Sequence, residues 1–318
     1  WTTPLLRDAR YDAIVHLVTA AQGAAEFYTT ENNSTRTETP EQACGIDEKL
    51  RQAWLGHPHH YIIDNSRHFS DKVQRVVAAI CQVIGCPSPA PAAQLRKFSL
   101  KVPQTPAEQI VLPADLKREE FFVEHVYLKL NALVEPSVII GEDPNVTTVM
   151  LRLQTRSQQN SRTYSLVSKR LNKANNTWAL LERRLNPREY AVLRLQADPS
   201  HCIVKKQVTT FLFHGGSFSL SKYLEPISLS YIEVYPTVSP SQTEAMSSYQ
   251  TNSSSSAPSF PAWLPIGSEV TNDPAFESFH ISSKSTKEDD QNSSGGGGGH
   301  HHRHHHSKVK SIVGIGSS

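Results

Sequence analysis

The chain has 318 residues, which is long for a single domain, so we expect two domains. Its net charge of +2 is too small to indicate a nucleic-acid-binding protein, and we expect no nucleic-acid partner. No apolar run reaches membrane-spanning length, and the start does not resemble a signal peptide, so we expect a soluble cytoplasmic protein. The four cysteines form no C-x-x-C pair, which favours free thiols in a reducing compartment.

The first predicted elements alternate between strand and helix. Residues 11–19 form an apolar run typical of a strand buried on both faces, and YIIDN (61–65) indicates a second strand. Between them, Thr39-Pro40 marks the start of a helix that should end near residue 54. This alternation predicts a parallel sheet. A second helix is predicted to end at Gly85, and its apolar residues recur at helical spacing: Val73, Val76, Val77, Ile80 and Ile84.

A polar stretch with an arginine separates the two predicted strands. ENNSTRTE (Glu31–Glu38) carries Arg36, and the order of strand, arginine-bearing lid, helix and strand is that of the back half of a phosphate-handling α/β domain. The glycine-rich motif G-x-x-x-x-G-K-[ST] does not occur, and the chain opens at Trp1 without an initiator Met. We therefore interpret residues 1–86 as the C-terminal half of a P-loop-type domain, from a chain trimmed at its start.

A second domain of different character is predicted over residues 95–283, after a proline-rich linker at 87–94. Its segments show period-two character and are rich in Val, Leu, Thr, Phe and Tyr. A helix opened by Asn186-Pro187 interrupts them. This pattern predicts an α+β domain built on a closed antiparallel β-barrel. The predicted strands are Leu95–Val102, Phe121–Leu130, Thr147–Arg156, Arg162–Arg170, Trp178–Leu185, Ile203–Phe213, Ser217–Tyr223 and Leu229–Tyr235.

Two stretches are predicted to be disordered. Residues 236–261 are rich in Ser, Thr and Pro and almost uncharged, which is typical of a disordered insert. Aromatic residues return at 260–281, where order should resume. Residues 284–318 carry a run of five glycines and HHHRHHH, and we expect a disordered tail. Its interrupted His tract could pick up Ni or Zn, or it is simply low-complexity sequence.

Basic residues recur within the predicted barrel strands. Arg152, Gln154 and Arg156 share one strand face, and Leu151 and Leu153 take the other. A barrel interior lined by such cations would bind polyanions such as triphosphates or inositol phosphates, because guanidinium forks match phosphate oxygens. Strand alternation leaves the alternative open, with the charges on a solvated outer face and Leu inside. The further charged positions are Lys169, Arg170, Glu182, Arg184, Lys205, Lys206 and Glu233.

The first domain offers its own candidates. Arg36 could reach a phosphate from its loop, or it is solvated surface. Asp64, at the end of the second strand, could contact a metal or a nucleotide, or it caps a turn. His57, His59 and His60 crowd around one proline and lack a fourth ligand, so no metal site is predicted there.

Two blocks of the first domain carry a family resemblance. YDAIVHLVTAAQGAAEFYTTENNSTRTETPEQA and AWLGHPHHYIIDNS resemble the NadR/AAA-type P-loop domain of the TRPL translocation defect protein family. In that family a CYTH-like barrel of the triphosphate-tunnel type follows. RKFSLKV, LRLQTR, RTYSLVSKR, LNPREY and LPIGSEVTNDPAFESFHIS resemble segments of this second part. The resemblance covers about residues 7–235 and 260–283.

The resemblance implies binding of GTP or ATP and of phosphoinositides or inorganic polyphosphate, with a regulatory role in intracellular membrane traffic and peripheral membrane contact. Mg would accompany the nucleotide in the full-length protein, and no cofactor is expected for this chain alone. The implied nucleotide-binding residues are Arg36, the lid arginine, with His57, Asp64 and Asn65. The implied basic barrel positions are Arg152, Arg156, Lys169, Arg170, Lys205 and Lys206; with Glu182 and Arg184 they form the candidate polyanion site.

The chain also departs from the family pattern. The phosphate loop and the acidic metal-holding motif are missing, and Gln154, Gln207 and Val208 stand at positions where the family is basic. Tunnel triphosphatases open with an E-x-E-x-K strand, whose carboxylates hold the catalytic metal. The corresponding strand here reads RKFSLK and supplies no carboxylate ligand. We therefore expect a binding protein rather than an enzyme. The alternatives are a P-loop kinase of the nicotinamide-riboside type, a metal-dependent triphosphatase using Glu182 and Glu233, and a scaffold without a ligand.

Overall fold

The computed structural model describes residues 3–31, 35–86, 88, 95–101, 110–130, 146–156, 160–172, 177–234 and 258–284. Apart from Ser88, the predicted linker at 87–94 lies outside the described residues, as does the predicted insert up to residue 257. The predicted tail lies outside them from residue 285 onward. The description below therefore concerns two parts, an α/β part (residues 3–86) and a sheet part (residues 95–284).

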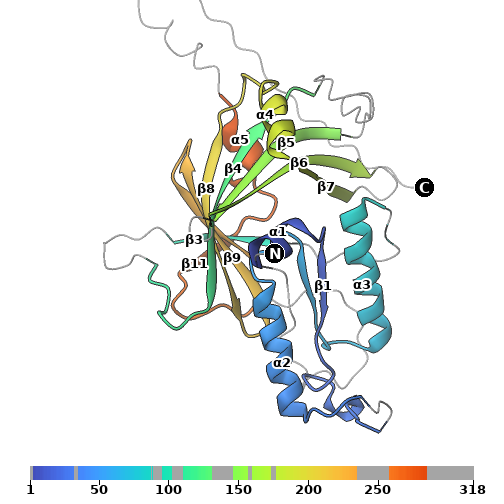
Figure 1. Cartoon of the computed structure of the whole chain (residues 1–318). Coiled ribbons are helices and arrows are strands. Elements are labelled where there is room, and N and C mark those ends of the chain that lie inside the picture. The colour runs from blue at the N-terminus through green and yellow to red at the C-terminus, as the bar shows by residue number, and fades with distance from the viewer. Residues whose placement is uncertain are drawn as a thin grey trace, which may run out of the picture. The chain divides into compact units, whose positions relative to one another are not determined.

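The α/β part contains a small parallel sheet, as predicted. Strand β1 (Ile14–Leu17) pairs in parallel with β2 (His60–Ile63). Helix α1 (Thr3–Ala9) precedes β1, and a short 3-10 turn η1 (Ala25–Phe27) follows it. Helices α2 (Pro40–Ala53) and α3 (Phe69–Ile84) confirm the two predicted helices to within a residue or two (Figure 1). Tyr61, Ile63 and Ala79 form the buried core between this sheet and α3.

Local signals in the sequence explain these helix ends. Thr39 accepts a hydrogen bond from the Gln42 backbone N–H, and the Gln42 side chain accepts one from the Thr39 backbone, so a complete capping box starts α2. Pro40 at the first helical position needs no hydrogen-bond acceptor. Gly85 ends α3 with a φ of +72°, in the left-handed region that favours glycine. Such local geometry is what made both helices predictable.

The sheet part is one nine-stranded antiparallel sheet in the order β11-β3-β10-β9-β8-β4-β5-β6-β7. Helix α4 (Pro187–Arg194), the turn η5 (Pro274–Phe276) and helix α5 (Ser278–Ser282) accompany it. All eight predicted strands are present, and β11 was not predicted. The strands are β3 (Arg96–Leu100), β4 (Arg118–Tyr127), β5 (Val146–Arg156), β6 (Ser161–Asn172), β7 (Thr177–Leu185), β8 (Val204–Phe213), β9 (Gly216–Glu225), β10 (Leu229–Val234) and β11 (Ile266–Glu269).

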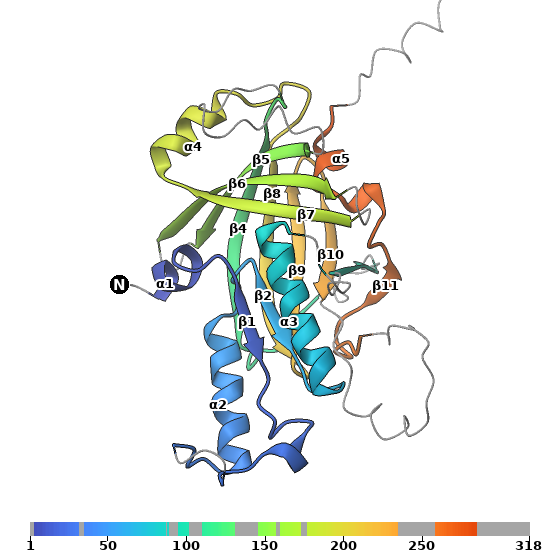
Figure 2. The ribbon, with the colours of Figure 1, turned by 90° about the vertical axis from the view of Figure 1, so that its right-hand side faces the viewer.

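The predicted closed barrel is not found in the part of the chain that the structure describes. Closure of the eight predicted strands would require β7 to pair with β3. The free edge of β3 is taken instead by β11, which pairs with it at Ile266↔Leu100 and Glu269↔Phe98. At the other end, β7 packs against α3, and Figure 2 shows this helix directly below β7. The sheet is therefore open, and helices and loops cover it where strand pairing was expected to close it.

The two faces of the sheet differ in chemistry. One face is apolar: Leu151, Leu166 and Leu185 pack under Tyr190 and Leu193 of α4. Farther along the same face, Phe98, Phe211, Phe218, Ile232 and Val234 pack against Phe260, Trp263 and Leu264. The opposite face, called here the polar face, carries charged and hydroxyl side chains and meets the α/β part. Within the described residues, no helix is long and apolar enough to cross a membrane.

Candidate functional site

Strand register assigns the predicted cations to the two faces. Residues paired across neighbouring strands share a face, and Arg152 pairs with Ser165, which pairs with Arg184. His125 pairs with Arg152 on the other side. Gln154 and Arg156 follow Arg152 at every second position of β5 and therefore share its face, as the sequence indicated. Both are buried. The alternative of a solvated outer face is wrong for these three side chains.

The other predicted positions are spread more widely. Glu182 and Lys206 also lie on the polar face, opposite Val167 and Val123. Lys169 shares this face, but its Nζ lies 3.8 Å from Glu277 near α5, at the far end. Arg170 and Lys205 belong to the opposite face, where Lys205 pairs with Glu225 at 3.1 Å. The structure therefore brings four of the eight predicted residues together, namely Arg152, Arg156, Glu182 and Arg184.

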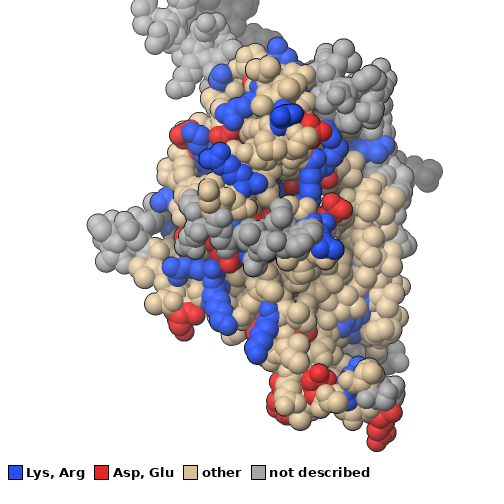
Figure 3. Space-filling model, viewed as in Figure 1, with Lys and Arg blue, Asp and Glu red and all other residues tan. Residues whose placement is uncertain are grey.

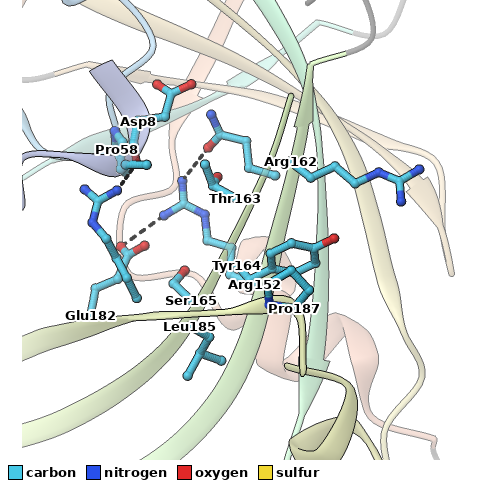
Figure 4. Close-up of a pocket in the computed structure, with 13 residues that line it drawn as sticks. Asp8, Pro58, Arg152, Arg162, Thr163, Tyr164, Ser165, Glu182, Leu185 and Pro187 are labelled. Carbon is cyan, nitrogen blue, oxygen red and sulfur yellow. Dashed lines mark hydrogen bonds and ion pairs between the residues drawn. The ribbon is translucent and has the colours of Figure 1, made fainter. Parts of the chain in front are cut away.

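A cavity of about 260 Å³ at the junction of the sheet with the α/β part is lined by Arg152, Glu182 and Arg184, but not by Arg156. Figure 4 shows Arg152 and Glu182 pointing toward each other on the cavity wall, with Asp8 and Pro58 contributed by the α/β part. Arg162 also borders the cavity, but its side chain extends away from Arg152 (Figure 4), in keeping with its pairing to Thr155 on the apolar side. The further lining residues are Ala9, Gln154, Thr163, Tyr164, Ser165, Arg184, Leu185 and Pro187.

A series of hydrogen bonds and ion pairs between side chains runs along the cavity wall. Arg152 Nη1 donates to Glu182 Oε2 at 3.2 Å, and Arg152 Nη2 donates to Gln154 Oε1 at 3.0 Å. From the α/β part, His59 Nε2 lies 2.9 Å from the same Glu182 oxygen. Burial raises the pKa of Glu182, but Arg152 and the hydrogen bond with His59 outweigh it and hold that pKa far below its usual range. Glu182 is therefore an anion that already has two partners.

Arg156 is the most enclosed of the predicted cations, with 2 % of its side chain exposed. Its Nε donates to Asp8 Oδ2 at 2.7 Å, and its Nη2 donates to Asp8 Oδ1 at 3.1 Å and to the Gly56 carbonyl at 3.0 Å. Nη1 donates to Glu119 at 3.1 Å, and the guanidinium lies 4.7 Å from the Phe121 ring centroid. Every nitrogen of this side chain thus has an acceptor, most of them in the α/β part.

Arg184 holds the same junction through backbone oxygens. Its guanidinium donates to the carbonyls of Asp8 and Tyr11, and its Nε lies 3.8 Å from the exposed Asp12 carboxylate. Arg156 and Arg184 therefore both bind oxygens supplied by the segment from Asp8 to Asp12. Of these oxygens, only those of the Asp8 carboxylate on Arg156 carry the negative charge that a phosphate group would also present.

Lys206 lies farther along the polar face. Burial lowers its pKa to about 8, and the charges of Lys97 and Arg152 act in the same direction, against Glu233. Its Nζ donates to the Tyr231 hydroxyl at 3.4 Å and lies 5.9 Å and 6.0 Å from the ring centroids of Tyr223 and Tyr231. Lys206 is half-buried, and the negative charge that raises its pKa is that of Glu233.

The predicted nucleotide residues of the α/β part do not form one site. Asn65, just after β2, donates from Nδ2 to the carbonyls of Thr19 and Gln22, both at 2.7 Å, and accepts from Lys72 Nζ at 2.5 Å. Asp64 pairs with Arg75 at 2.8 Å. These contacts tie the ends of β1 and β2 to each other and to α3, which is a structural role.

Arg36 and His57 lie elsewhere. Arg36 donates to the Thr29 carbonyl at 2.7 Å and stands 5.1 Å from the Tyr28 ring centroid, both within its own loop. His57 precedes β2, whereas Asp64 follows it, so the two lie at opposite ends of that strand. His57 Nε2 donates to the Tyr11 carbonyl at 3.0 Å, and burial lowers its pKa to about 4. His57 therefore supports the junction with the sheet.

Sequence reasoning missed the carboxylate at the centre of the site. Asp8 lies in α1, a helix that no sequence signal before residue 11 predicted. Glu119 was missed because it is the second residue of β4, between two other charged residues, Arg118 and Glu120. As for metals, no group of three or more His, Cys, Asp or Glu side chains comes together within the described ranges. What gathers at the junction is mostly arginine, which suits an anion rather than a metal ion.

Charge is unevenly distributed over the molecule. In Figure 3, on the one face in view, Lys and Arg gather over the sheet part and α4, whereas Asp and Glu gather at the lower tip of the α/β part. Near the cavity, Arg7 adds a further cation, paired with Asp8 at 3.0 Å and with Glu119 at 3.4 Å. The cations at the junction are Arg7, Arg152, Arg156 and Arg184; the buried or half-buried carboxylates are Asp8, Glu119 and Glu182.

A family model described as an AAA domain matches residues 1–72 of this chain. The match supports a P-loop AAA-type domain. It spans less than a quarter of the chain, and no curated protein matches. None of the matches names the TRPL translocation defect family, so that resemblance stays a hypothesis.

Three solved structures resemble about half of the chain. The PH1819 protein from Pyrococcus horikoshii OT3 is 13% identical with a TM-score of 0.31, and the match covers 48% of this chain and 85% of that one. The PH1012 protein from the same organism is 18% identical with a TM-score of 0.28, covering 48% and 84%. A conserved hypothetical protein from Pyrococcus furiosus is 18% identical with a TM-score of 0.27, covering 47% and 82%. Likeness at this level carries no argument about function.

Proposed function

We propose that this chain binds phosphate-bearing polyanions on the polar face of its antiparallel sheet, as a regulatory binding protein rather than an enzyme. The observation that carries the proposal is the cavity bounded by Arg152 and Arg184, with Arg156 behind it. Guanidinium groups bind phosphate oxygens through paired, charge-assisted hydrogen bonds. A cavity of about 260 Å³ suits a compact ligand such as a triphosphate or an inositol phosphate headgroup. The membrane-traffic role implied by the resemblance would use the same site for phosphoinositide headgroups.

The test compares two neighbouring arginines of β7. Arg184 faces the cavity, whereas Arg183 faces the other side, where it pairs with Glu189 at 3.5 Å. In isothermal titration with inorganic tripolyphosphate, Arg184→Gln is expected to weaken binding about 10- to 100-fold, because a charge-assisted contact contributes about 1.5–3 kcal/mol. Arg183→Gln removes the same charge from an exposed pair and is expected to change the affinity by about twofold or less.

Three arms of the same experiment separate the ligand sources. Tripolyphosphate, a soluble inositol phosphate and vesicles carrying a phosphoinositide share the phosphate chemistry and differ in whether a membrane is needed. Equal losses in both variants, or no binding by the unaltered chain in any arm, would remove the polar face as the site. Mg-dependent release of phosphate from tripolyphosphate would instead favour the triphosphatase alternative, with Glu182 and Glu233 as metal ligands.

A second proposal concerns the α/β part. We propose nucleotide binding by the full protein in this part, supported by the AAA-domain match over residues 1–72. Because the sequence contains no G-x-x-x-x-G-K-[ST] motif, this chain alone is expected to bind Mg-GTP or Mg-ATP weakly. Titration with each nucleotide tests this, and phosphate transfer to a small-molecule acceptor would favour the kinase alternative.

A further inference from the structure

The polar face is not free in this structure, because the α/β part already supplies one carboxylate and several carbonyl oxygens to its arginines. The Asp8 carboxylate meets Arg156 with two oxygens on two nitrogens, at 2.7 and 3.1 Å. The Gly56 carbonyl adds a third oxygen at 3.0 Å. The carbonyls of Asp8 and Tyr11 do the same for Arg184. The paired contact of a carboxylate with a guanidinium has the geometry that a phosphate adopts.

We infer that the segment Asp8–Tyr11, with Gly56, is a built-in competitor that occupies the arginines of the polar face until a polyanion displaces it. This inference rests on the proposed function and names its regulation. Asp8 is held next to Arg156 by the fold, so it competes at a high effective concentration. A ligand that needs Arg156 binds only molecules in which the segment has been displaced. Its apparent affinity is therefore reduced in proportion to the fraction of molecules in that state.

The same geometry sets the class of ligand that can displace the segment. Arg156 is 2 % exposed and has an acceptor on every nitrogen, so a ligand with a single phosphate gains little by replacing one carboxylate with another anion. The cavity beside it adds Arg152 and Arg184. These two arginines are more accessible than Arg156, so a chain of phosphates can engage them first and then reach Arg156. The expected ligand is therefore a linear or clustered polyphosphate, with inorganic monophosphate ineffective at the same concentration.

The decisive variant is Asp8→Asn, which keeps the side-chain shape and removes the competing charge. Tripolyphosphate is expected to bind Asp8→Asn about tenfold or more tightly than the unaltered chain, within the usual range for coupling between sites. Asp115→Asn is the matched control. It removes the same charge from an exposed aspartate that does not line the cavity. Its effect on the affinity is expected to be about twofold or less.

A second measurement does not depend on any variant. Hydrogen exchange of the unaltered chain is expected to speed up in residues 3–12 and 56–60 when tripolyphosphate is added, and to slow in β5 and β6. Slower exchange in residues 3–12 would overturn the inference. An Asp8→Asn variant that is folded by circular dichroism but binds no tighter would also overturn it while leaving the proposed function standing. If neither form binds tripolyphosphate, the proposed function fails and this inference fails with it.

Discussion

At the scale of single residues, His57 and His60 are buried within the α/β part in their neutral form. Burial lowers the pKa of His60 from 6.5 to about 3, and the charges of His16, His57 and Arg51 act in the same direction. Neither ring nitrogen of His60 has a hydrogen-bond partner among the described residues. The folded state therefore resists protonation of both rings, whereas in the unfolded chain both rings are protonated with the ordinary pKa of about 6.5.

The stability should accordingly fall as the pH decreases from about 6.5, and the contribution of His60 should level off near pH 3. Within that window each such histidine lowers the free energy of unfolding by about 1.4 kcal/mol per pH unit. His60→Phe is expected to remove roughly half of the loss, since His57 titrates in the same direction. Urea unfolding at pH 7, 6, 5 and 4.5 measures this, with the exposed His68→Phe as control. Parallel curves for His60→Phe and the unaltered chain would contradict the assignment.

At the scale of elements, the end of α3 depends on a single glycine. Gly85 has a φ of +72°, and a Cβ added there would lie 2.5 Å from Leu181 Cδ2 of β7. Gly45, inside α2, has no atom within 4 Å of the corresponding position. The two glycines therefore respond oppositely to the same added methyl group.

Gly85→Ala is expected to lower the free energy of unfolding by about 1–3 kcal/mol, from the strained backbone and the overlap with β7. Gly45→Ala is expected to raise it by about 0.5–1 kcal/mol, because alanine has the higher helix propensity. Thermal and urea unfolding of the two variants provide the comparison. A Gly85→Ala variant as stable as the unaltered chain would mean that α3 does not press against β7 there.

The elements also show which features of the fold could be predicted from the sequence. Thr39, Pro40 and Gly85 act within a few residues of chain, so the helix ends were predictable. Strand alternation, which is equally local, predicted that Arg152 and Arg156 share a face, but it did not say whether that face is buried or solvated. The open sheet was not predictable, because alternation does not say which strand edges meet. β11 escaped prediction because IGSE is short and lacks an apolar pattern, and its partner β3 lies far away in the chain. Asp8 escaped for a related reason, since its role depends on Arg156 148 positions later.

At the scale of the whole molecule, the α/β part and the sheet belong to one compact unit, Trp1–Lys284. Charged contacts that are shielded from water join them. Arg156, Asp8 and Glu119 form the centre of this junction, and Arg51 adds a contact to the Gly215 carbonyl at 3.4 Å. The unfolding of one part should therefore be linked to the unfolding of the other.

Arg156→Met is expected to lower the free energy of unfolding by about 3–5 kcal/mol, because it leaves the buried Asp8 carboxylate without its main partner. The double variant Arg156→Met/Asp8→Asn should recover part of that loss, with an interaction energy of about 1–3 kcal/mol. Denaturant unfolding followed by intrinsic fluorescence measures the cycle, and Arg183→Met on the exposed side of β7 is the control. Strictly additive losses would show that the pair does not couple the two parts.

The pairing of β11 with β3 has a consequence for how the protein is made. Ser99 and Ser268 contact each other across 169 positions of chain, and Phe260 and Leu264 complete the core beside them. Residues 266–269 therefore have to be synthesised before β3 gains its second neighbour. Until then the backbone N–H and C=O groups on one edge of β3 are unpaired and can pair with strands of other chains. We therefore expect the incomplete polypeptide to need protection by chaperones against aggregation.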